Sequence, residues 1–193
     1  MEFNSIFKPM IAAGIVASLL VVACETKNKM DSAEIADEKN EAKFDGAQEN
    51  GADFILELSK ANLSEIRTAQ LGAKMAQSPE VKEFASNMID QHKKMYGDNV
   101  IYAAANNISI PDTIAKGDIS EYDNLTEKTG VDFDVKFVDV MVDDHKRLID
   151  KLERASKNEK YTQEIKSMSA QALPLVRPHY QRAVELQDNL KKK

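Results

Sequence analysis

The sequence predicts an all-α protein, a four-helix bundle with a long crossover between its second and third helices. Three observations support this fold class. Apolar residues recur at helical spacing in four segments, at about 53–77, 79–105, from near Asp132 onward, and 160–190. The connections inside the first and the second pair of helices are short, which is typical of antiparallel hairpins. The connection between the two pairs, from Asn106 to Gly130, is 25 residues long.

The long central connection decides the topology. A helix of 25 residues is about 37 Å long, whereas 25 extended residues reach about 80 Å. The connection can therefore run the whole length of the bundle, with room for a short helix near 119–128. We expect the third helix to begin at the end of the bundle opposite to the one at which it would begin in a simple up-and-down bundle. This gives the long-crossover arrangement.

Two prolines interrupt the fourth helix. We predict its inward face from the helical spacing of eight residues: Ile165, Met168, Ala172, Leu175, His179, Ala183, Leu186 and Leu190. Pro174 and Pro178 lie within this segment. Because an interior proline removes a backbone hydrogen bond and costs about 3 kcal/mol, we expect a kink or a break near His179.

The N-terminal segment is typical of an export signal. An uncharged, mostly apolar run follows Lys8 and ends in Val-Val-Ala-Cys at Cys24. It is shorter than the roughly 20 apolar residues that span a bilayer, and a small residue before cysteine is typical of a bacterial lipoprotein signal. We predict a signal peptide at residues 1–23 and lipidation of Cys24, which places the protein in the bacterial cell envelope, anchored on the periplasmic or outer-membrane side.

The rest of the chain divides into a polar segment and a helical domain. Residues 24–51 are rich in charged residues and poor in large apolar ones, so we expect a flexible tether there. Residues 52–190 are expected to form the domain. The formal net charge of −6 argues against nucleic acid as a partner, because that function needs a cationic surface. Cys24 is the only cysteine, which excludes an intrachain disulfide and a cysteine zinc site.

Two of the three histidines stand in a repeated phrase. MIDQHKKM contains His92 and MVDDHKRL contains His145, each with an aspartate two residues earlier. Two residues correspond to about 200° around a helix, so Asp90 and Asp143 point away from the face that holds the histidines. The phrase therefore predicts one inward histidine per helix rather than an Asp-His catalytic pair.

Each predicted helix has one strongly polar residue on its apolar face: Glu65, His92, His145 and His179. All four lie 11 to 13 residues from a helix end, so they are expected at the same height in the bundle. Burying a polar group without a partner costs roughly 2–7 kcal/mol. Two interpretations follow: the four residues bind a metal ion, or they form a metal-free network of hydrogen bonds with water.

Several segments resemble a known family. LSEIRTAQLGAKMAQSPEVKEFASNMIDQHKKM, GVDFDVKFVDVMVDDHKRLID and ALPLVRPHYQRAVEL are similar to the bacterial family called domain of unknown function 4142, which is placed in the ferritin-like superfamily. The similarity covers nearly all of residues 52–190. It implies a ferritin-like four-helix fold and an exported, often lipid-anchored protein, and it implies no particular reaction.

The expected site differs from the di-iron centres of ferritin-like proteins. Those centres use Glu-x-x-His pairs, but Ile89, Val142 and Val176 stand three residues before the histidines. Three imidazoles and one carboxylate suit one divalent transition-metal ion instead: zinc, manganese, iron or copper. Four protein ligands leave no open position, so we do not expect an enzyme. The alternative is a metal-free structural or partner-binding envelope module with a buried Glu-His hydrogen-bond network.

Overall fold

The computed structural model describes residues 30–192, apart from the side chains of residues 118–120. The predicted signal peptide, residues 1–23, and Cys24 lie outside the described residues. The described part contains six helices: α1 (Ser32–Glu41), α2 (Gly46–Met75), α3 (Pro79–Ala105), α4 (Lys116–Thr126), α5 (Gly130–Ala155) and α6 (Gln163–Lys191). The predicted all-α class is confirmed. No helix in this range is long and apolar enough to cross a bilayer.

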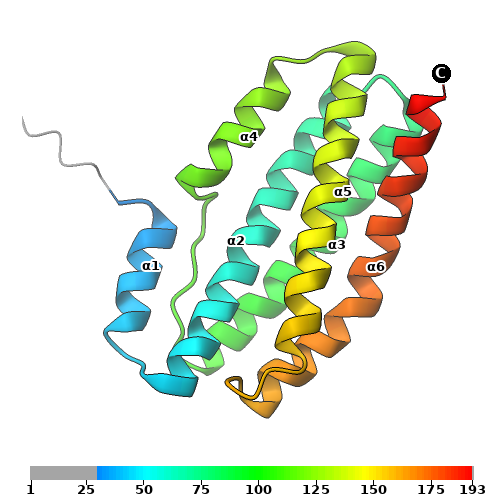
Figure 1. Ribbon diagram of the computed structural model, residues 1–193. Helices are drawn as coiled ribbons and strands as arrows, with labels where there is room; N and C mark the ends of the chain where they lie inside the picture. Colours follow the sequence, from blue (N-terminus) through cyan, green and yellow to red (C-terminus); the bar gives the residue numbers. More distant parts are fainter. Residues whose placement is uncertain (1–29, 193) are drawn as a thin grey trace, which may run out of the picture.

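The four long helices lie side by side, and two hairpins make most of the contacts (Figure 1). Helix α2 packs on α3, and α5 packs on α6. The connection from α3 to α5 runs back along the length of the bundle and contains α4, so α3 and α5 point in the same direction (Figure 1). This is the long crossover that the 25-residue connection predicts, and its short helix begins three residues earlier and ends two residues earlier than expected.

The turn between α2 and α3 is fixed by a residue from α5. Ser78 is the N-cap of α3 and Pro79 is its first residue, as the sequence suggests. The buried carboxylate of Asp134 accepts hydrogen bonds from the backbone N–H groups of Gln77 and Ser78, at 2.8 and 2.7 Å. These charge-assisted bonds join the two hairpins at one end of the bundle.

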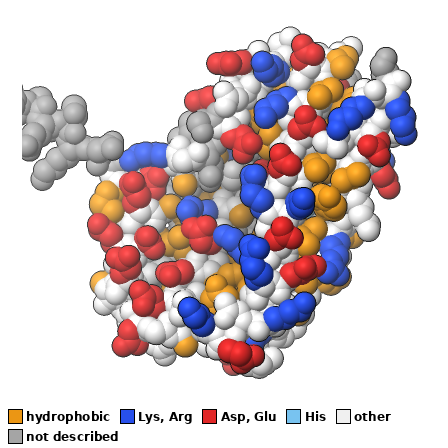
Figure 2. All heavy atoms as spheres, in the orientation of Figure 1, with side chains coloured by type: hydrophobic (Ala, Val, Ile, Leu, Met, Phe, Trp, Pro, Cys, Tyr) orange, Lys and Arg blue, Asp and Glu red, His pale blue; other side chains and the backbone are white. Residues whose placement is uncertain are grey.

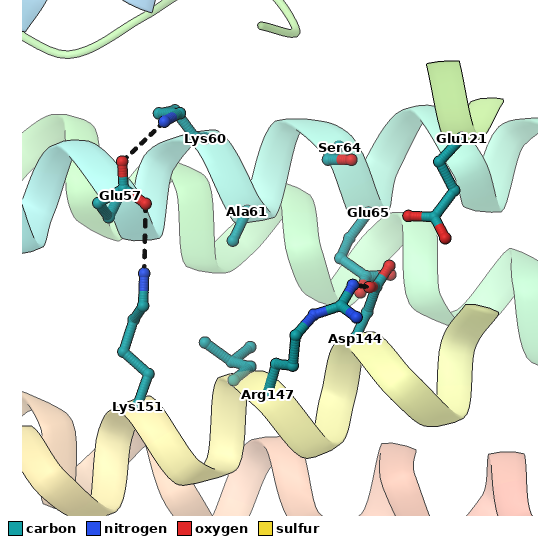
Figure 3. A pocket seen from close by; sticks show the side chains of 10 residues that line it. Glu57, Lys60, Ala61, Ser64, Glu65, Glu121, Asp144, Arg147 and Lys151 are labelled. Atoms are coloured by element: carbon teal, nitrogen blue, oxygen red, sulfur yellow. Dashed lines mark hydrogen bonds and ion pairs between the residues drawn. The ribbon is translucent and has the colours of Figure 1, made fainter. Parts of the chain in front are cut away.

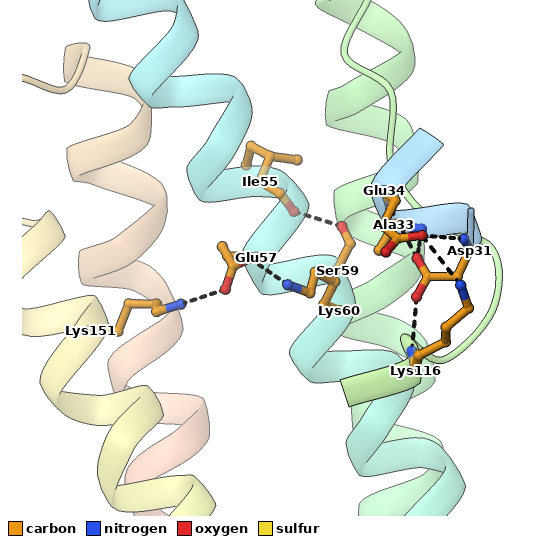
Figure 4. Close-up of polar contacts among 9 residues, drawn as sticks. All are labelled: Asp31, Ala33, Glu34, Ile55, Glu57, Ser59, Lys60, Lys116 and Lys151. Atoms are coloured by element: carbon orange, nitrogen blue, oxygen red, sulfur yellow. Dashed lines mark hydrogen bonds and ion pairs between the residues drawn. The ribbon is translucent and has the colours of Figure 1, made fainter. Parts of the chain in front are cut away.

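The expectation of a flexible tether through residue 51 needs correction. Residues 32–41 form α1, and α2 begins at Gly46. Asp31 caps α1 in a capping box with Glu34, and its second carboxylate oxygen accepts from the backbone N–H of Lys116 at 2.9 Å (Figure 4). Asn40 exchanges two hydrogen bonds with the backbone of Ser109. These polar contacts, together with the burial of Ala33 and Ala36, hold the segment against the rest of the domain, which composition did not indicate.

Helix α6 is continuous through both prolines. Of the two predicted outcomes, a kink or a break near His179, the break is therefore absent. Each proline leaves the carbonyl four residues earlier without its helical donor, and those carbonyls belong to Ala170 and Pro174, which are both exposed. Water can satisfy them there. The inward face also differs from the prediction by one residue: Val176 is buried, and Leu175 is 53% exposed.

Two apolar cores fill the interior. The first lies toward the α2–α3 turn and includes Met88, Phe137 and Met141. The second lies toward the other end of the bundle and includes Phe54 and Leu152. On every long helix, the residue that the sequence places in the site falls between the members of the two cores. The site is therefore a polar layer between two apolar ones.

Candidate metal centre

His92, His145 and His179 meet in the polar layer. Their ring centroids are 5.4 to 5.5 Å apart in all three pairs. One ring nitrogen from each histidine lies within 4.8 Å of the others, which is close enough for the three to hold a metal ion. The side chains of His92 and His145 are fully buried, and His179 is 6% exposed. The three are the only histidines of the chain.

The protonation of His92 follows from its partner on α2. Its Nδ1 lies 2.9 Å from Oδ1 of Asn62. The amide of Asn62 has a fixed orientation, because its Nδ2 donates to the carbonyl of Leu58 at 3.0 Å. Oδ1 can only accept, so Nδ1 of His92 has the proton. Nε2 of His92 then has a lone pair.

The other two rings follow the same rule. Nδ1 of His145 donates to the carbonyl oxygen of Met141 at 2.8 Å, which leaves a lone pair on Nε2. Nε2 of His179 donates to Oε1 of Gln91, which leaves a lone pair on Nδ1. Each histidine thus has one nitrogen fixed by an oxygen acceptor, as is usual for metal-binding imidazoles.

The three nitrogens with lone pairs have no hydrogen-bond partner among the described residues. They are Nε2 of His92, Nε2 of His145 and Nδ1 of His179, all buried. None can donate to another, because all three are acceptors in these tautomers. One water molecule has two protons and can satisfy only two of them. A metal cation accepts all three lone pairs at once.

Burial keeps the rings neutral. Burial is the main reason why the pKa values of His145 and His179 are lowered to about 4. For His145, the hydrogen bond to the Met141 carbonyl acts in the opposite direction and raises the pKa. The pKa of His92 lies well below its usual value, first because of burial and then because of the other two histidines. Metal binding needs neutral imidazole. The site therefore keeps its ligands available at neutral pH.

Glu65, the fourth residue predicted for the site, lies behind His145. Its Oε1 is 3.6 Å from Nδ1 of His145, the nitrogen that faces the Met141 carbonyl. It does not belong to the group of ligand atoms within 4.8 Å of one another, which consists of the three histidines. Burial raises the pKa of Glu65 to about 8, with a further contribution from Glu121 and opposition from Arg147. Its Oε2 has no partner in the described part of the chain.

A pocket of about 270 Å³ begins at Glu65 and opens between α2 and α5. Figure 3 shows Asp144 and Arg147 of α5 next to the Glu65 carboxyl group, with Glu121 of α4 nearby. The pKa of Asp144 is raised to about 8 by burial and by the charge of Glu65. These effects outweigh its ion pair with Arg147, whose side chain is 67% exposed. Burial and their mutual repulsion thus disfavour a negative charge on both Glu65 and Asp144 at the same time.

Two residues that orient the histidines, Asn62 and Gln91, were not predicted from the sequence. Asn62 stands one helical turn before Glu65, so its place on the same inward face could have been recognised. Gln91 precedes His92 and is mostly exposed, and no sequence signal indicates that it reaches His179 on another helix. Asp90 and Asp143 are exposed, as the helical geometry predicts.

Surface charge adds no second candidate on the face shown in Figure 2. Lysine and arginine side chains are interspersed there with aspartate and glutamate, and acidic residues gather over α1 (Figure 2). At the border of α2 and α5, Glu57 pairs with both Lys60 and Lys151, at 2.7 and 3.3 Å (Figure 4). The first contact lies within α2, and the second joins α2 to α5 through opposite charges.

Comparison with known proteins identifies the family. The family model described as domain of unknown function (DUF4142) matches residues 34–186. The chain belongs to this family. No curated protein and no solved structure matches it. The match begins within α1, in agreement with the corrected start of the domain.

Proposed function

We propose that this member of the DUF4142 family is a lipid-anchored protein of the bacterial cell envelope that binds one divalent transition-metal ion through His92, His145 and His179. The observation on which the metal site rests is the set of three buried nitrogen lone pairs described above. Glu65 serves as a carboxyl group behind His145 rather than as a ligand in this geometry. The long crossover supports the ferritin-like relationship that the sequence suggested.

The ligand set favours particular metals. Neutral imidazole suits zinc, copper and iron, whereas manganese prefers oxygen ligands. Three nitrogens around a tetrahedral zinc ion lie about 3.4 Å from one another when each bond is about 2.0–2.1 Å long. The present separations are at most 4.8 Å, so the rings need to move together by no more than on the order of 1 Å to bind the ion.

Binding of the ion is favoured over catalysis. Three histidines leave a fourth position for another ligand, which is the arrangement of many catalytic zinc sites. However, His92 and His145 are fully buried and His179 is only 6% exposed. A substrate would have to reach an ion enclosed by all three rings. The site is built to retain an ion, and the fourth ligand is a small one such as water.

The metal content of the purified protein tests this proposal. A chain of residues 25–193 without a histidine tag contains all described helices and both cores. Elemental analysis by mass spectrometry should give about one zinc, copper or iron ion per chain, and much less in His92→Ala and His145→Ala. Asp90→Asn is the matched control, because Asp90 is exposed and stands two residues from His92.

The outcomes separate the two functions that the sequence left open. Metal bound well below one ion per chain in the wild type, after incubation with each of the three ions, would support the metal-free envelope module instead. Membrane partitioning of the full chain tests the anchor separately. Cys24→Ser should move the protein from the membrane fraction to the aqueous one, and unchanged partitioning would refute lipidation.

A further inference from the structure

A second pocket lies beside the metal centre, on the side of the other apolar core. Its volume is about 300 Å³, and it lies between α2, α3, α5 and α6. Its wall is mainly aliphatic and thioether side chains: Leu58, Met95, Leu148, Leu152, Met168 and Leu175. Leu175 is 53% exposed at this wall because the buried face of α6 passes through Val176. The pocket is thus apolar and open to solvent.

One buried polar group in this pocket is unused. Asn99 is 5% exposed, lines the pocket, and its Nδ2 has no hydrogen-bond partner in the described structure. Two other amides line the wall. Asn62 is occupied at both ends by Leu58 and His92, and Nε2 of Gln171 donates to the hydroxyl of Ser167 at 3.0 Å. Buried amide donors nearly always have an acceptor in folded proteins. Asn99 therefore offers a donor to a molecule that enters the pocket.

The charges at the wall select against anions. Asp98 lines the pocket, with its side chain 61% exposed and paired with Lys94 at 2.9 Å. No lysine, arginine or histidine lines the pocket. A carboxylate ligand would meet the carboxylate of Asp98 and no cationic side chain of the pocket lining. The pocket thus fits a neutral molecule better than a fatty acid.

We propose that this pocket binds a small, neutral, mainly apolar molecule with a carbonyl group. The alkyl part would pack against the leucines and methionines, and the carbonyl oxygen would accept from Nδ2 of Asn99. The volume is near the lower end of the range for ligand pockets, and about twice that of an engineered apolar cavity that binds benzene. A chain of about seven carbons is a suitable size. Binding does not depend on the metal ion.

Three probes of similar size test the proposal: 2-heptanone, heptanoate, and 2-methyl-1-heptene, in which a CH₂ group replaces the carbonyl oxygen. They are titrated into residues 25–193, treated with a chelator and labelled at the methionine methyl groups for NMR. 2-Heptanone should shift the signals of Met95 and Met168 and leave that of Met141, in the other core, unchanged. Heptanoate and the alkene should bind at least tenfold more weakly.

Two variants and a control complete the design. Asn99→Leu should remove the preference for the ketone over the alkene, and Ala172→Phe, at the pocket wall, should abolish binding of both. Val100→Ala, at a neighbouring position that is 41% exposed and does not line the pocket, should change neither. Circular dichroism checks that each variant is folded. Absence of shifts at Met95 and Met168, or equal binding of ketone and alkene to the wild type, would overturn the proposal.

Discussion

Asn62 and His92 fix each other in one orientation. The amide nitrogen of Asn62 donates to the Leu58 carbonyl at 3.0 Å, so its oxygen faces Nδ1 of His92 at 2.9 Å. This single contact determines which nitrogen of His92 has the proton, and hence that its Nε2 can bind a metal. A residue on α2 thereby controls a ligand on α3.

Replacing Asn62 should weaken metal binding without removing a ligand. Asn62→Leu leaves Nδ1 of His92 without its acceptor, and loss of such an orienting residue typically lowers metal affinity 10- to 100-fold. Competition with a chromophoric zinc indicator measures the affinity. Gln70→Leu, an exposed position on the same helix, should have the wild-type affinity. An unchanged affinity in Asn62→Leu would show that this contact does not orient a ligand.

Glu65 should destabilise the metal-free protein at alkaline pH. Its pKa rises from 4.5 to about 8 on folding, so its protonated form contributes stability that is complete below about pH 4.5 and is lost as the pH rises through about 8. Glu65→Gln removes this loss. The melting temperature of the variant relative to wild type should therefore increase between pH 5 and 9. Glu83→Gln, exposed on α3, should show no such trend.

The histidines should destabilise the metal-free protein on the acid side. The pKa of His145 and of His179 is lowered from 6.5 to about 4 on folding. The unfolded chain therefore binds protons first, and stability present above pH 6.5 is lost as the pH falls toward 4. Urea denaturation at a series of pH values measures this loss. His179→Asn should reduce the slope of the free energy of unfolding against pH. A slope equal to that of wild type would contradict the assigned neutral state of His179.

Gly72 permits the close approach of α2 to α5. A Cβ atom at this position would lie 2.5 Å from two ring atoms of Phe137 and 3.0 Å from Cβ of Ala85. Such overpacking typically costs 1–3 kcal/mol, so Gly72→Ala should lower the free energy of unfolding by about that amount. Gly97→Ala is the matched control: a Cβ there meets no atom within 4 Å, and alanine favours a helix by up to about 1 kcal/mol. A gain of stability in both variants would contradict the close packing of Gly72 against Phe137.

Helical periodicity predicted the fold because four segments have strong apolar faces and one connection is long enough to cross the bundle. It also predicted the site histidines, since His92, His145 and His179 stand in those faces. Periodicity could not distinguish Leu175 from Val176, because both lie near the edge of the same stripe.

Contacts that depend on tertiary geometry could not be predicted in this way. The helix at residues 32–41 is ordered by hydrogen bonds from Asp31 and Asn40 to the crossover segment, which is distant in sequence. Gln91 reaches a histidine 88 positions away. The height of Glu65 in the bundle was foreseeable, but which ring nitrogen it faces depends on the rotamers of both side chains.

X-ray absorption spectroscopy of the zinc-loaded protein tests the central claim most directly. The three lone pairs predict a first shell with three imidazole nitrogens at about 2.0–2.1 Å and one further light-atom ligand. The multiple-scattering signal of the imidazole rings should fall in His179→Asn and remain in Asp90→Asn. A zinc ion with one imidazole or none in the wild type would contradict the claim that His92, His145 and His179 bind one ion together.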